Sequence, residues 1–133
     1  MDRQYYVPTV VRLRIKGGII VQGCDVYVSR PQYQGGWKLE GSIWANPYKC
    51  KTEEERVIAV NSYRVYILGE ITKNPNLWIP ILKNIVSQNR SLTLGCWCKA
   101  DSKGNYKDVL CHADVIVELC KETIKCLIEQ NRK

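Results

Sequence analysis

Three cysteines and the only histidine of this 133-residue chain fall within residues 95–115. Cys96 and Cys98 are two positions apart, and twelve residues separate them from the adjacent pair Cys111 and His112. Three thiolates and one imidazole form a donor set that zinc binds in closed tetrahedral sites, although two cysteines separated by a single residue are a less common spacing there. The donor set therefore indicates a metal site at these four residues, with zinc as the expected ion.

The same residues also suit covalent chemistry. Cys111 stands where a helix is expected to begin, and a helix N-terminus stabilises a thiolate. His112 beside it is a proton acceptor, so Cys111 and His112 are the catalytic candidates if the protein is an enzyme. A third interpretation is structural, because cysteines are often buried as small apolar side chains and His112 would then make only a local hydrogen bond. The sequence leaves these interpretations open.

A strand must position the first cysteine pair, and a helix the second. Residues 91–95 are expected to form the strand. Side chains two positions apart point to the same side of a strand, so both thiols are expected on one side. The intervening residues are rich in turn formers, so the chain can fold back. The helix is expected over residues 112–129, with one apolar face made of Ile116, Val117, Cys120, Ile124, Leu127 and Ile128.

Short strands are expected in the first part of the chain. Residues 10–15 alternate apolar and basic side chains, the pattern of a half-exposed strand. Gly17 and Gly18 indicate a tight turn into residues 19–21, which predicts a hairpin. Residues 24–29 are expected to form a further strand.

Two more helices are expected before the cysteines. Thr52 and Glu55 form a capping-box pattern, and the helix over residues 52–68 should pack on the sheet that contains Leu92 and Leu94. The second helix opens at Asn74 and Pro75. Pro80 is expected to bend the second helix or to delay its regular part. The apolar positions are Val57, Val60, Tyr63 and Ile67 in the first helix and Leu77, Ile81, Leu82 and Ile85 in the second.

This order of elements predicts a single compact α/β domain over residues 1–133, with a small mixed sheet flanked by about three helices. Apolar residues make up 45% and charged residues 25% of the chain, as in globular proteins. Without an apolar leader or a membrane-spanning run, an intracellular protein is expected, cytoplasmic or nuclear and not secreted, with reduced thiols and no membrane partner.

The charge balance points to a phosphate-bearing partner, since the net charge is +7. Arg30 directly follows a predicted strand, and a guanidinium can hold a phosphate with two parallel hydrogen bonds. Trp44 and the aromatic side chains near it are suited to stacking on a base. The alternative is that Arg30 forms an internal ion pair and Trp44 covers the end of the sheet.

Five motifs resemble, in their order, the family catalogued as domain of unknown function 4326. They are Asp25-Val26-Tyr27-Val28-Ser29-Arg30, Trp44-Ala45-Asn46-Pro47-Tyr48, Arg56 with Tyr63-Arg64, Cys96-Trp97-Cys98, and Cys111-His112. The resemblance spans residues 25–119 and implies an α/β fold with a site, but no established reaction. Ser29, Pro31 and Ala45 stand where similar proteins carry glycine. Similar proteins are frequent in phages and large DNA viruses, which implies a viral source.

The function expected from these observations is the binding of a nucleotide or nucleic acid at a surface ordered by zinc. Its ligand-binding residues are expected to be Arg30, Trp44, Asn46, Arg56, Tyr63 and Arg64. Two alternatives stand beside it. One is an enzyme acting on a nucleotide or nucleic acid through Cys111 or a metal-bound water. The other is a viral protein–protein interaction module, such as a homodimer, in which the cysteines belong to the core.

Overall fold

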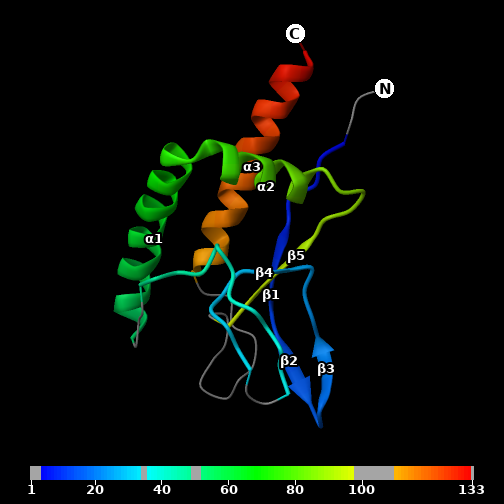
Figure 1. Ribbon diagram of the computed structural model, residues 1–133, viewed down its shortest axis with the longest axis vertical. Coiled ribbons are helices and arrows are strands. Elements are labelled where there is room, and N and C mark those ends of the chain that lie inside the picture. The colour runs from blue at the N-terminus through cyan, green and yellow to red at the C-terminus, as the bar shows by residue number, and fades with distance from the viewer. Residues whose placement is uncertain (1–3, 34–35, 49–51, 98–109, 133) are drawn as a thin grey trace.

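Five strands and three helices follow one another in the computed structural model, which describes residues 4–33, 36–48, 52–97 and 110–132, apart from the side chain of Glu53. They confirm the predicted α/β class (Figure 1). Their bounds are β1 Thr9–Arg12, β2 Arg14–Lys16, β3 Ile19–Gln22, β4 Val26–Tyr27, α1 Glu53–Lys73, α2 Pro75–Val86, β5 Thr93–Cys96 and α3 His112–Asn131.

The main sheet has three parallel strands in the order β1-β5-β4, so the strand latest in the sequence lies in the middle. Arg12 of β1 is in register with Cys96, and Tyr27 of β4 with Gly95. Because the strands are parallel, their last residues meet on one side of the molecule. We call this side, which holds Arg12, Tyr27 and Cys96, the carboxyl edge.

The predicted hairpin is confirmed as the antiparallel pair β2–β3. Gly17 and Gly18 have φ of 60° and 78°, the left-handed conformation that two-residue hairpin turns require. The single strand predicted over residues 10–15 is divided at Leu13, because the chain there changes its pairing partner from β5 to β3. Leu13 itself is buried.

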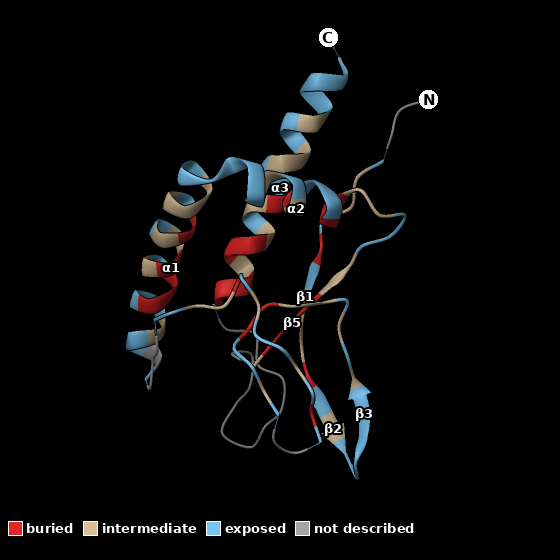
Figure 2. Ribbon diagram, viewed as in Figure 1, coloured by how far each residue is buried: buried red, intermediate tan, exposed pale blue. Residues whose placement is uncertain are grey.

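Helix α3 lies against β1 and β5, and α1 and α2 pack on α3 and on each other (Figure 1). The prediction that α1 lies on the sheet is therefore corrected, although Val60, Tyr63, Ile67 and Leu94 share one core. Burial is concentrated in the half of α3 nearer the sheet and on the facing side of α1 (Figure 2). Val57, predicted to be in the core, is 50% exposed, because the first turns of α1 extend past the start of α3 (Figure 1).

Helix α1 begins as predicted, since the amide of Glu55 donates to Oγ1 of Thr52 at 3.1 Å. Helix α2 begins with Pro75 and continues through Pro80 without interruption. Its buried face consists of Trp78, Leu82, Ile85 and Val86, whereas Leu77, predicted to be in the core, is 45% exposed. No helix in the described part of the chain combines the length and the apolar character needed to cross a membrane.

Candidate functional site

The carboxyl edge brings together three of the four predicted metal ligands. Cys96 ends β5, Cys111 is the N-cap of α3, and His112 is the first residue of that helix. The Sγ atoms of Cys96 and Cys111 are 3.4 Å apart, and Cys111 Sγ lies 3.7 Å from His112 Nδ1. All three residues are buried. We refer to Cys96, Cys111 and His112 as the Cys–His cluster; Cys98 lies outside the described residues.

The start of α3 is fixed by a capping box built on Cys111. Its sulfur accepts a hydrogen bond from the amide of Ala113 at 3.4 Å, and its own amide donates to the carboxylate of Asp114 at 2.9 Å. Backbone donors at a helix N-terminus require such partners. Cys111 therefore has a local structural role in addition to any chemistry.

The ring of His112 is held in one orientation. Its Nε2 is 2.7 Å from the carbonyl oxygen of Val28, and because a carbonyl only accepts, Nε2 carries the proton. The neutral ring then presents the lone pair of Nδ1 toward Cys111. Burial lowers the pKa of His112, while the bond to Val28 opposes that shift and the positive charge of Arg30 adds to it. The imidazole is thus neutral near pH 7, the form that can accept a proton or bind a metal.

The chemistry open to the Cys–His cluster is limited by its burial and ligand number. Among the residues that the structure describes, no three cysteine, histidine or acidic side chains are arranged to hold a metal ion. Cys96 and Cys111 have no solvent exposure, so a large substrate has no direct access to either sulfur. The ring of Tyr63 stands nearly perpendicular to His112 at 5.2 Å between centroids and covers the imidazole from the side of α1.

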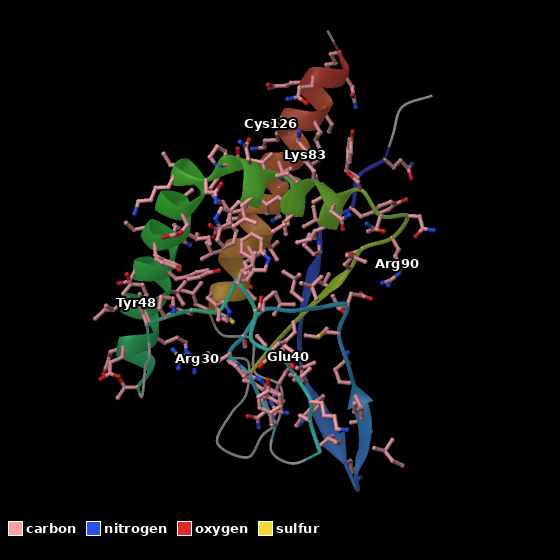
Figure 3. The ribbon with its side chains drawn as sticks, in the orientation of Figure 1. Arg30, Glu40, Tyr48, Lys83, Arg90 and Cys126 are labelled. Atoms are coloured by element: carbon pink, nitrogen blue, oxygen red, sulfur yellow. The ribbon has the colours of Figure 1, made fainter. Side chains whose placement is uncertain are left out.

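Arg30 is the exposed charged residue beside this cluster. Its Nη2 donates to the carbonyl oxygen of Asn46 at 2.8 Å, and its own carbonyl accepts a hydrogen bond from the hydroxyl of Tyr27. The side-chain amide oxygen of Asn46 in turn accepts from the amide of Tyr48 at 2.9 Å. These bonds place Arg30 near the lower end of α3 in Figure 3, with Tyr48 at the same side of the molecule.

Trp44 and Tyr63 lie beneath the edge, inside the core. Trp44 is 2% exposed and packs edge to face on Trp78, with 4.8 Å between ring centroids. The hydroxyl of Tyr63 donates to the carbonyl of Trp44 at 2.8 Å, and burial strongly raises the pKa of Tyr63. Both residues therefore support the loop that carries Asn46.

The two arginines of α1 occupy different surroundings. Arg56 lies in the first turn of the helix and is half-buried. Arg64 donates to both carboxylate oxygens of Glu118, at 3.0 and 3.2 Å, and to the side-chain oxygen of Asn61 at 2.8 Å. Its guanidinium thus joins α1 to α3.

Two motif residues have roles that sequence reasoning did not assign. Asp25 accepts two hydrogen bonds from Arg90, at 2.5 and 2.8 Å, and one from the amide of Thr93 at 2.8 Å, so it ties β4 to β5. Trp97 donates from Nε1 to the hydroxyl of Tyr27 at 2.8 Å and packs edge to face on Trp37. The place of Asp25 and Trp97 in the motifs indicated that they matter. It did not identify their partners, which lie far away in the sequence.

The relatives of this chain support the resemblance drawn from its motifs. The uncharacterized protein R718 of Acanthamoeba polyphaga mimivirus is 34% identical over 114 residues, which cover 86% of this chain and 80% of that protein. No solved structure matches the chain. The profile of the family described as Domain of unknown function (DUF4326) matches residues 11–122, a range that includes all five motifs. The chain therefore belongs to the DUF4326 family.

Proposed function

We propose that this protein binds a phosphate-bearing ligand, a nucleotide or a nucleic acid, at the carboxyl edge, with Arg30 as the main contact. The observation that supports it is that no carboxylate in the described part of the chain neutralises the positive charge of Arg30. Its exposed guanidinium has one hydrogen bond, to the carbonyl oxygen of Asn46, and no carboxylate partner within the described residues. By contrast, Arg64 and Arg90 are each paired with a carboxylate.

The surroundings of Arg30 suit an anionic ligand. Ligands of open α/β sheets commonly bind beyond the carboxyl ends of parallel strands. A guanidinium with free donors there offers two parallel hydrogen bonds to a phosphate. Arg56 enters from α1 as a second basic side chain, and the net charge of +7 attracts polyanions from a distance. Asn46, Trp44 and Tyr63 act in this proposal by holding the loop on which Arg30 rests.

The test is a binding measurement by fluorescence anisotropy with a labelled single-stranded oligonucleotide, with adenosine monophosphate as a competitor. Arg30→Ala should weaken binding by about tenfold, the value of a lost charge-assisted hydrogen-bond pair. Lys83→Ala removes the same charge from α2, distant from Arg30 in Figure 3, and should change affinity little. Affinity should also fall steeply with salt. Absence of binding of either compound at low salt would refute the proposal.

We further propose that a bound zinc ion orders the carboxyl edge. Cys96, Cys98, Cys111 and His112 would bind it, and a ligating histidine usually donates its other ring N–H to a carbonyl, as His112 does to Val28. Sulfurs bound to one tetrahedral zinc lie about 3.8 Å apart, and the Cys96 and Cys111 sulfurs are 3.4 Å apart. With four protein ligands, the ion would be structural.

Metal analysis of protein purified without a metal-chelating tag tests this part of the proposal. About one zinc ion per chain is expected, and Cys98→Ser should lower both the zinc content and the melting temperature, because metal binding is coupled to folding. Cys126→Ser is the control, since Cys126 is exposed on α3. Protein that contains no zinc and melts unchanged after the Cys98 substitution would exclude a metal site.

A catalytic cysteine is the second candidate function. It is favoured by the orientation of His112, whose Nδ1 faces Cys111 Sγ while Val28 holds its other nitrogen. Alkylation with iodoacetamide at neutral pH, followed by mass spectrometry, tests it. If Cys111 is an activated thiolate, it should react faster than the exposed Cys126. Faster labelling of Cys126 would leave Cys111 as a capping and core residue.

A further inference from the structure

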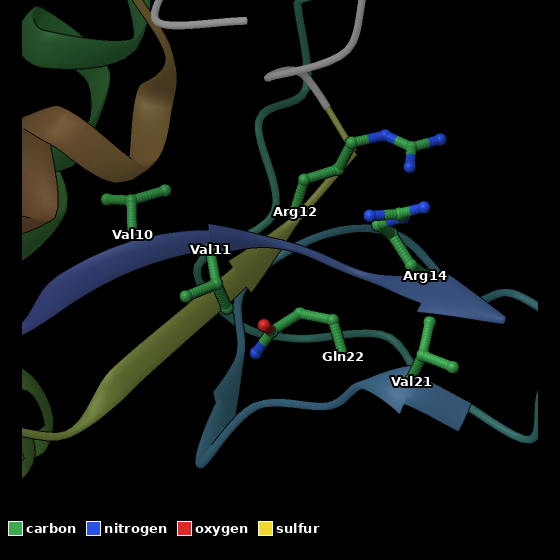
Figure 4. Close-up of a pocket in the computed structure, with 6 residues that line it drawn as sticks. All are labelled: Val10, Val11, Arg12, Arg14, Val21 and Gln22. Atoms are coloured by element: carbon green, nitrogen blue, oxygen red, sulfur yellow. The ribbon is translucent and has the colours of Figure 1, made fainter. Parts of the chain in front are cut away.

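Arg12 and Arg14 line a pocket, and neither residue belongs to any of the five motifs. The pocket has a volume of about 290 Å³, and its other lining residues are Val10, Val11, Val21 and Gln22 (Figure 4). Arg12 ends β1 and Arg14 begins β2, so their side chains leave the same face of the chain, while Leu13 between them is buried. Figure 4 shows both guanidinium groups on one side of the strand.

The two guanidinium groups are not neutralised by the protein. In the described part of the chain, neither arginine forms an ion pair or a hydrogen bond, and the Nε of Arg12 is buried without an acceptor. None of the six lining residues is acidic. A buried donor without a partner destabilises the protein, and two adjacent cations repel each other. A bound anion would remove both costs.

We propose that this pocket binds a phosphate group through Arg12 and Arg14. Two guanidinium groups can direct several N–H donors at one tetrahedral anion, and such pairs are well matched to phosphate oxygens. The three valines form an apolar wall that can contact the sugar that carries the phosphate. The amide nitrogen of Gln22 already donates to the carbonyl oxygen of Gly23 at 2.8 Å, so the arginines carry the recognition.

The pocket is separate from the site proposed around Arg30, although both lie at the carboxyl edge. Arg12 lies on β1, where it is in register with Cys96 of β5, whereas Arg30 follows β4 on the other side of β5. The phosphate can therefore belong to a free nucleotide or to one position along a nucleic-acid strand. The proposal rests on Arg12 and Arg14 alone and stands whether or not Arg30 binds a ligand.

Isothermal titration calorimetry on the whole chain tests this proposal. The ligands are inorganic phosphate, adenosine monophosphate and an oligothymidylate of about 12 nucleotides. The double variant Arg12→Gln with Arg14→Gln should bind all three at least about tenfold more weakly. Lys83→Gln, which removes one charge from α2, should bind as the original protein does. The double variant Arg12→Lys with Arg14→Lys should restore the affinity only in part, because lysine cannot form the two parallel bonds.

The outcomes separate this site from the one around Arg30. In protein that already carries Arg30→Ala, the Arg12 and Arg14 double variant should still lower the affinity for inorganic phosphate by at least about tenfold. Stronger binding of the oligothymidylate than of the monophosphate would identify the source as a nucleic-acid strand, and equal binding a free nucleotide. Unchanged phosphate affinity in the glutamine double variant would overturn the proposal. If that variant does not fold, Arg14→Gln alone provides the same test, because Arg14 is exposed.

Discussion

Gly95 is a residue whose missing side chain shapes the sheet next to the Cys–His cluster. A Cβ atom at this position would lie 2.4 Å from Cys24 Sγ, 2.7 Å from Cys24 Cβ and 3.0 Å from a methyl carbon of Leu13. Such distances require neighbouring atoms to move. Glycine here allows Leu13, which follows β1, and Cys24, which precedes β4, to approach β5 closely.

Gly95→Ala should therefore lower the free energy of unfolding by about 1–3 kcal/mol, the usual cost of overpacking a core. Urea denaturation followed by tryptophan fluorescence measures it. Adding Cys24→Gly to this variant should recover part of the loss, because it removes the two closest contacts. An alanine variant as stable as the original protein would show that the strands can separate at no cost.

Asp25 makes stability depend on pH. Hydrogen bonds from Arg90 and from Thr93 hold the pKa of Asp25 well below its usual value. Since the folded-state pKa lies below the unfolded value of about 3.9, this contribution is present above that pH and is lost as the pH falls below it. Urea midpoints measured from pH 7 to about pH 3 should decline more steeply for the original protein than for Asp25→Asn. Parallel declines would assign the acid sensitivity to other carboxylates.

At the scale of elements, α1 is destabilised by an interior glycine. Gly69 lies inside this helix, and a Cβ atom there would meet nothing within 4 Å. Glycine in a helix interior costs about 0.5–1 kcal/mol relative to alanine. Gly69→Ala should therefore stabilise the protein by about that amount, which a rise in the urea midpoint would report. Gly95→Ala is expected to lower the free energy of unfolding instead, so the two variants together show where packing, and where backbone propensity, determines the effect of an added methyl group. A loss of stability in Gly69→Ala would contradict this account.

The helices and the hairpin were predictable because their signals are local. Thr52 and Glu55 stand three positions apart, Asn74 and Pro75 are adjacent, and Gly17 and Gly18 form the turn itself. The division of the first strand at Leu13 was not predictable, because it depends on a change of partner between β5 and β3. The same reason explains why α1 was placed on the sheet: its apolar stripe shows that it is buried but not against which element.

At the scale of the whole molecule, the sequence predicted that Cys96 and Cys111 meet, since the first follows a predicted strand, the second stands at a predicted helix start, and the residues between them can fold back. It did not show that Trp44 is buried against Trp78, because a tryptophan in a loop has the same sequence signature whether it faces solvent or core. Nor did it indicate that Arg12 and Arg14 share a pocket, since basic residues alternating along a strand usually face water.

The sheet order predicts the behaviour of a shortened chain. β5 begins at Thr93 and pairs with both β1 and β4, which do not pair with each other. A chain ending at residue 90 would retain α1 and α2 but lose every hydrogen bond of the parallel sheet, along with α3. Circular dichroism should show residual helix without a cooperative thermal transition. A cooperative transition in this chain would mean that residues 1–90 have a core of their own.

The central position of β5 also has a consequence for the protein during its synthesis. The ribosome releases β1 and β4 long before Thr93–Cys96 can insert between them, and neither strand has its parallel partner until then. Pairings between such distant segments form slowly, and unpaired strand edges of nascent chains invite association with other chains. The completed core therefore depends on a strand translated after both of its neighbours, and until that strand emerges the edges of β1 and β4 are open to pairing with other chains.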